Sequence, residues 1–213
     1  MKDIPVFTAE YGAASLILKE IPYQQAAYVI IQDSLEPEKL IEECLGFCRA
    51  CGAEKIYATG HAALQTSPFY TAMWEMRCPA EALADTAAAL WPVQDETLSA
   101  WRNIYNEKVA RVPNGAWMTE NDGREMLNKG DGYFIHRGET LLGIGRASCG
   151  RIDWVASVRP GAGRDVVLAL GHAVTEEVLT LPVASVNRKA VSLYEGLGFI
   201  KVRELSRWHQ IFG

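Results

Sequence analysis

One stretch near the C-terminus, residues 179–199, constrains the fold of this chain more than any other. It reads as an apolar strand, an asparagine at a turn, and a short helix that stops at a glycine. Within the helix, Ala190, Leu193 and Tyr194 recur at the spacing of one helical face. Gly198 follows where a helix end favours a left-handed residue. The stretch therefore predicts a strand–turn–helix unit.

Other predicted elements lead into this unit in a definite order. Helices are expected over residues 95–110 and after Thr119, because apolar side chains recur there at helical spacing. Three strands joined by turns follow, over residues 133–136, 141–147 and 152–158. The second half thus reads as two helices, a three-strand meander, and then helix, strand, helix, strand.

The motif of Asn187, Ala190, the run Leu193-Tyr194-Glu195 and the run Leu197-Gly198-Phe199 resembles the closing motif of the GCN5-related N-acetyltransferases (GNAT). The order of elements over residues 92–213 is similar to that of the same family. The resemblance implies an α/β fold with a GNAT-like mixed, mostly antiparallel central sheet flanked by helices. It also implies an acyl-CoA-dependent N-acetyltransferase, which transfers an acetyl group from acetyl-CoA to a primary amine of a small molecule or peptide.

The first half carries a weaker pattern, and we expect a division into residues 1–82 and 83–213. Short apolar runs predict strands over residues 14–20, 26–32 and 55–59, with a helix beginning near Pro37 and capped by Ser34. The residues that precede Tyr70 weakly resemble those that precede Tyr194. The first half is therefore either a degenerate GNAT-like copy or an ordinary helix-to-strand unit.

A glycine-containing loop after the third meander strand is the expected cofactor loop. Such a loop before a helix offers free N–H groups and the positive end of the helix dipole to an anion. By resemblance, Gly161, Gly163 and Arg164 contact the CoA pyrophosphate. Asp165 stands where the family has a small residue, and there it either opposes the phosphates, with arginines offsetting it, or supports the helix N-terminus.

The preceding strand is the second expected cofactor contact. The resemblance implies that this strand splays from its neighbour and that its main chain pairs with the pantetheine arm, so Val155, Ala156 and Val158 are predicted to bind acetyl-CoA. A buried apolar strand is the alternative, and both descriptions can hold together.

Three further side chains are candidates for the chemistry of acyl transfer. Tyr194 matches the family's general acid; otherwise it is a core aromatic residue. Asp153 is the candidate base, or a solvated residue on an open face. Asn187 contacts the cofactor or caps the helix. No metal site is expected.

Two other functional classes remain open at this point. A catalytically inactive CoA- or ligand-binding module is favoured by Asp165 and by a loop one residue short of the family pattern. An interaction protein in which both halves are scaffolding is the third possibility. The three cysteines Cys44, Cys48 and Cys51 lie on one helical face, either as a metal or redox cluster or as small buried apolar side chains.

The net charge and the hydropathy of the sequence limit the classes of partner that we expect. The net charge of −5 gives no electrostatic support for nucleic acid or an anionic membrane. The sequence has no apolar run near the ~18 residues of a membrane span and no secretory signal, so a cytoplasmic location is expected. The final strand, residues 202–212, reads as exposed and suggests a homodimer by edge pairing.

Overall fold

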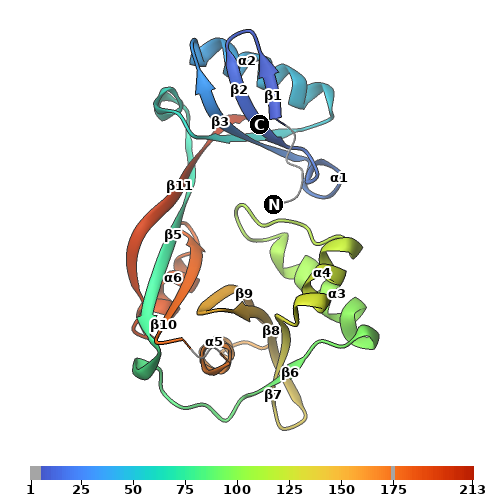
Figure 1. Cartoon of the computed structure of the whole chain (residues 1–213), viewed down its shortest axis with the longest axis vertical. Helices are drawn as coiled ribbons and strands as arrows, with labels where there is room; N and C mark the ends of the chain where they lie inside the picture. The colour runs from blue at the N-terminus through green and yellow to red at the C-terminus, as the bar shows by residue number, and fades with distance from the viewer. Residues whose placement is uncertain (1–5, 174–175) are drawn as a thin grey trace. The chain divides into compact units, whose positions relative to one another are not determined.

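The computed structural model describes residues 6–173 and 176–213 (Figure 1). The chain forms two compact units, one of Met1–Ala72 with Leu205–Gly213 and one of Met73–Glu204. The long strands β5 (Phe69–Pro79) and β11 (Ile200–Phe212) each contribute residues to both units. The expected division into residues 1–82 and 83–213 stays a prediction.

The first unit is a sheet covered by one long helix. Its strands follow the order β1-β2-β3-β4-β11. Their bounds, with those of the two helices, are β1 (Val6–Ala9), β2 (Gly12–Ile17), α1 (Ile21–Gln24), β3 (Ala26–Ser34), α2 (Pro37–Ala50) and β4 (Lys55–Thr59). Alternate apolar residues of these strands pack with Leu40, Cys44 and Cys48 of α2 in one core.

The second unit carries the elements that resemble the GNAT pattern. Its strands follow the order β5-β10-β9-β8-β7-β6. The elements after β5 are β6 (Ala89–Pro92), α3 (Leu98–Val109), α4 (Glu120–Lys129), β7 (Gly132–Arg137), β8 (Thr140–Ser148), β9 (Arg151–Ser157), α5 (Gly163–His172), β10 (Val178–Ala184) and α6 (Arg188–Glu195). The sheet is mixed and mostly antiparallel, with β9 and β10 parallel, so the expected fold class is confirmed.

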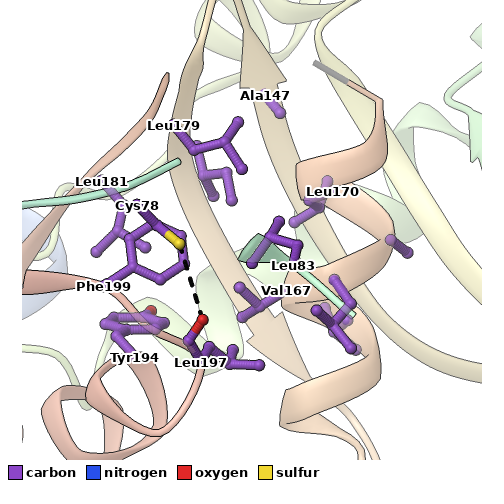
Figure 2. Close-up of a cluster of buried hydrophobic side chains, with 14 of the residues drawn as sticks. Cys78, Leu83, Ala147, Val167, Leu170, Leu179, Leu181, Tyr194, Leu197 and Phe199 are labelled. Atoms are coloured by element: carbon purple, nitrogen blue, oxygen red, sulfur yellow. Dashed lines mark hydrogen bonds between the residues drawn. The ribbon is translucent and has the colours of Figure 1, made fainter. Parts of the chain in front are cut away.

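Helices α5 and α6 share a core with the strands of this unit (Figure 2). Tyr194 and Phe199 lie there beside Cys78 of β5, and the Cys78 thiol donates a long 3.8 Å hydrogen bond to the carbonyl of Leu197. Gly198 has a φ of +93°, which confirms that the chain leaves the helix through a left-handed residue. This core fixes α6 and the turn after it.

Helices α3 and α4 form a separate core with β8. Trp101 is fully buried at its centre and donates from its indole N–H to the carbonyl of Tyr133 at 2.9 Å. The start of α4 is a capping box, in which Thr119 and Asp122 each accept from the other's backbone N–H. The capping box holds the loop between α3 and α4 at its α4 end.

Several details differ from the sequence-based expectations. Neither β5 nor β6 was expected as a strand. Ser34 belongs to β3, where its hydroxyl donates to the carbonyl of Tyr11, and Glu36 is the residue that precedes α2. Tyr70 lies in a strand, whereas Tyr194 lies in a helix, so the two tyrosines are not equivalent.

The final strand, β11, differs in part from the exposed edge that was expected. β11 lies between β4 and β5 in the sheet order, and residues His209–Phe212 pair with β4. This pairing closes the end of the strand to a second chain, whereas residues 200–205 are exposed. A homodimer by edge pairing remains a prediction. Among the described residues, no helix is long and apolar enough to cross a membrane.

Candidate active site

Strands β9 and β10 separate soon after they meet. In the described chain they pair at one position, Arg151 with Thr180, where the N–H of Thr180 donates to the carbonyl of Gly150 at 2.8 Å. Because backbone groups alternate sides along a strand, the peptide groups of Pro182 and Ala184 lie on the same edge as those of Thr180. Pro182 has no N–H and leaves no unpaired donor in the opening.

A β-bulge in β9 accompanies this separation. On β8, Arg146 pairs with Trp154 and the next residue, Ala147, pairs with Ile152. Asp153, between Ile152 and Trp154, is therefore an extra residue of β9 that faces no paired residue of β8. A bulge bends its strand and redirects the side chains around it, and bulges are frequent beside active sites.

A cavity of about 270 Å³ opens where the two strands part. Its walls come from β9 and β10, from the start of α6, and from the end of α3 with the loop that follows. Tyr105 and Trp154 form an aromatic side of the cavity, with ring centroids 4.4 Å apart. Asp153 is the charged residue among the described side chains that line it.

Both predicted catalytic residues line this cavity. Tyr194 is 7% exposed, and burial raises the pKa of its hydroxyl to about 12. The hydroxyl is therefore protonated throughout the physiological pH range. The Asp153 side chain is 34% exposed, and its carboxylate accepts a 2.7 Å hydrogen bond from Arg151 Nε. The structure brings these two side chains to one cavity.

Asn187 combines the two roles that the sequence left open. Its side-chain oxygen accepts from the N–H of Ala190 at 3.3 Å, so it caps α6. It also lines the cavity, at the end of β10. Its carbonyl oxygen is engaged in the cap, and its amide N–H groups are the part with which it could contact a ligand.

The residues in and after β9 that were predicted to contact the cofactor through their main chain differ in the direction of their peptide groups. Some face β8 and others point away from it. Val158 donates its N–H to the carbonyl of Leu142 at 2.8 Å, and Ala156 pairs with Ile144 two positions along the same ladder. Since hydrogen-bonded and non-hydrogen-bonded pairs alternate, the peptide groups of Val155 and Ser157 point away from β8. These two residues offer the free edge, and sequence reasoning had not included Ser157.

The loop before α5 has the shape of an anion site. Gly161 adopts a φ of +80°, and α5 begins at Gly163 after Ala162, with Arg164 exposed in its first turn. A Cβ at Gly163 would lie 3.0 Å from Leu193 Cδ2 of α6, so a glycine permits the close approach. The first N–H groups of α5 have no acceptor within the helix.

Asp165 is held by two other residues. A guanidinium nitrogen of Arg137 lies 2.6 Å from the carboxylate, and the Thr86 hydroxyl donates to it at 3.2 Å. It lies in the first turn of α5 and is not the N-cap residue, which is Ala162. A negative charge in the first turn of a helix is favourable.

Comparison with known proteins supports the fold. No protein-family model matches the sequence, and a search of the curated proteins finds no match. Solved structures do match. A functionally unknown conserved protein from Staphylococcus epidermidis has a TM-score of 0.62 at 13% identity, with 98% of this chain and 93% of that chain covered.

Two structures of acetyltransferases also match most of this chain. A GCN5-related N-acetyltransferase from Sphaerobacter thermophilus has a TM-score of 0.61 at 15% identity, covering 93% of this chain and 75% of its own. A putative acetyltransferase from Pyrococcus horikoshii has a TM-score of 0.59 at 12% identity, covering 95% and 70%. The chain therefore has the fold of the GCN5-related N-acetyltransferases, and the expected resemblance is confirmed at the level of the fold.

Proposed function

We propose that this chain is an acyl-CoA-dependent N-acetyltransferase that acetylates a primary amine of a small molecule or peptide. The observation that carries the proposal is the separation of β9 and β10 after Arg151 and Thr180, with Tyr194 and Asp153 on the cavity it creates. A parallel pair that breaks its ladder exposes backbone donors and acceptors to a ligand. The fold shared with acetyltransferases agrees with this reading.

The residues present fit acetyl-CoA. The free peptide groups of Val155 and Ser157 could pair with the amides of a pantetheine arm. The start of α5, with Gly161, Gly163 and Arg164, could bind the pyrophosphate. Asp165 does not oppose the phosphates as a free charge, because Arg137 pairs with it. This pair weakens the argument for a CoA-binding module that has lost catalysis.

The side chains have separate tasks in the proposed reaction. Acetyl-CoA supplies the acetyl group as a thioester. The Asp153 carboxylate would accept a proton from the acceptor ammonium, which leaves a nucleophilic amine. The Tyr194 hydroxyl would donate a hydrogen bond to the departing sulfur. Because its pKa of about 12 lies above that of a thiol, the hydroxyl stabilises the thiolate mainly as a hydrogen-bond donor.

Calorimetry with acetyl-CoA tests the cofactor part of this proposal. We expect micromolar binding, weakened by Arg164→Ala because a cation that faces the phosphates is lost. Lys129→Ala, at the far end of α4, is a control with the same change of charge. A screen of primary amines for release of free CoA then tests transfer. Binding without any amine-dependent release would favour the inactive module, and no binding at millimolar concentration would contradict both readings.

A further inference from the structure

The backbone of β9 does little to hold Asp153, the candidate base. Asp153 is the extra residue of the bulge, so it has no partner on β8, and it lies beyond the position at which β9 pairs with β10. Its side chain is 34% exposed, which leaves space for other rotamers. A general base must lie within hydrogen-bond distance of the proton that it accepts. The carboxylate therefore needs a second contact that fixes its direction.

Arg151 provides this contact from the paired end of the strand. Its Nε donates a 2.7 Å hydrogen bond to Oδ1 of Asp153. The backbone of Arg151 is held on both sides, because the residue pairs with Ser148 of β8 and with Thr180 of β10. The N–H of Thr180 also donates to the carbonyl of Gly150 at 2.8 Å. A charge-assisted hydrogen bond from a backbone held in this way can keep a carboxylate in one direction.

The hydrogen bond occupies one oxygen of the Asp153 carboxylate and leaves the other available. None of the residues that the structure describes donates a hydrogen bond to Oδ2. An ionised carboxylate accepts at both of its oxygens, so Oδ2 can take up a proton while Oδ1 stays bound. Because the side chain is partly exposed, the proton can afterwards pass to water.

A second ion pair of the same unit has the opposite arrangement. Arg146 of β8 donates to both oxygens of Asp131, from Nε to Oδ1 at 3.2 Å and from an η nitrogen to Oδ2 at 2.7 Å. Asp131 is buried, so this carboxylate is closed to a substrate. The charge of Arg146 also acts on Asp153, but no hydrogen bond joins the two side chains. Arg151 is therefore the arginine that can orient the candidate base.

We propose that Arg151 is a positioning residue, which holds Oδ1 of Asp153 so that Oδ2 receives the proton of the acceptor amine. The inference rests on the proposed acetyltransferase function. The proton moves from the amine nitrogen to Oδ2, and the guanidinium neither gains nor loses a proton. Arg151 does not line the cavity, so it acts through Asp153 and touches neither the acetyl group nor the amine.

Two substitutions of Arg151 test this role, with acetyl-CoA and a primary amine that the screen for CoA release identifies. Arg151→Met keeps a long apolar stem and removes every donor. We expect kcat to fall about tenfold, a part of the contribution of a general base. KM for the amine and the affinity for acetyl-CoA should stay as in the unmodified protein. Arg151→Lys restores a charged donor and should recover part of kcat. Lys129→Met, far along α4, is the control for the loss of a charge.

A double-mutant cycle separates positioning from a structural effect. Asp153→Asn removes the base and keeps the size of the side chain. If Arg151 acts through Asp153, Arg151→Met should cause no further loss of kcat in the Asp153→Asn protein. If Arg151 instead supports the strand, Arg151→Met should lower kcat by the same factor in both backgrounds.

Equal losses in the two backgrounds, or full activity of Arg151→Met, would overturn the inference. An increase in kcat would overturn it as well, because the ion pair would then keep the carboxylate from the amine. Full activity of Asp153→Asn would remove the base and the inference together and leave acetyl transfer standing. Failure of the unmodified protein to bind acetyl-CoA, or to release CoA with any amine, would remove the proposed function itself.

Discussion

The guanidinium of Arg137, at the end of β7, lies 2.6 Å from the carboxylate of Asp165, in the first turn of α5. Arg137 thus places a positive charge beside Asp165, the acidic residue of the expected phosphate-binding loop. Asp165 can then stand beside an anion site, because its charge is offset by a partner from another strand.

Removing this partner should weaken cofactor binding. In Arg137→Ala, the Asp165 carboxylate is left without its cation, and we expect the affinity for acetyl-CoA to fall about fivefold, since a partly exposed ion pair contributes up to about 1 kcal/mol. Calorimetry measures the change. The double variant Arg137→Ala/Asp165→Asn should recover most of the affinity. A double variant as weak as the single one would show that Arg137 acts in another way.

The Tyr194 hydroxyl should matter for turnover more than for binding. Its ring packs in the core beside Phe199, with centroids 6.0 Å apart, and Tyr194→Phe preserves that packing. We expect kcat to fall by about 10²-fold, the lower end of the effect of a proton donor, with little change in the melting temperature or the affinity for acetyl-CoA. Full activity in Tyr194→Phe would assign the residue to the core alone.

A buried carboxylate in the second unit should make stability depend on pH. Glu75 accepts from Arg203 at 2.9 Å and from Arg77 at 3.0 Å. The hydrogen bond from Arg203, joined by that from Arg77, holds the pKa of Glu75 below its ordinary value of 4.5. Because the pKa of Glu75 is lower in the folded than in the unfolded state, its ion pairs stabilise the fold at pH values above the ordinary pKa. This stabilisation is lost as the pH falls through the lowered pKa.

Glu75→Gln should therefore flatten the decline of the melting temperature between about pH 5 and pH 3. The exposed Glu81→Gln, in the same unit, is the matched control and should leave the slope as it is. An equal slope in Glu75→Gln and in the unmodified protein would show that this ion-pair cluster does not contribute to acid sensitivity.

The cysteines of α2 should behave as core side chains. Burial raises the pKa of the Cys44 thiol to about 11 and that of Cys48 to about 12, whereas Cys51 and Cys149 are exposed. A thiol reagent at about pH 8 attacks thiolates, so the native protein should show two fast thiols and the denatured protein all five. Cys51→Ser/Cys149→Ser should abolish the fast phase. A third fast thiol, or release of bound zinc, would restore the metal or redox interpretation.

Local signals in the sequence predicted much of the second unit. The Asn187 cap, the left-handed Gly198 and the helix start after Thr119 have chemical signatures that act within a few residues. The strands of the meander were predicted because their apolar runs are bounded by turns. Elements that depend on distant partners were missed. β5 and the position of β11 between two neighbours follow from tertiary pairing, which a short window of sequence does not encode.

The same contrast applies to the candidate site. Tyr194 and Asp153 were found from motif position, and the structure places both on one cavity. The bulge at Asp153 and the free edge at Ser157 depend on the register with β8, which a single sequence does not show.

The most direct test of the central claim follows backbone amides by NMR while acetyl-CoA is added. If the cofactor binds where β9 and β10 separate, the largest shifts and the strongest protection from exchange should appear at Val155, Ser157 and the first turn of α5, Gly163–Asp165. Amides of the first unit, such as Val29 and Ala58, should change little. Changes confined to the first unit, or none at saturating acetyl-CoA, would contradict the assignment of this opening as the acyl-CoA site.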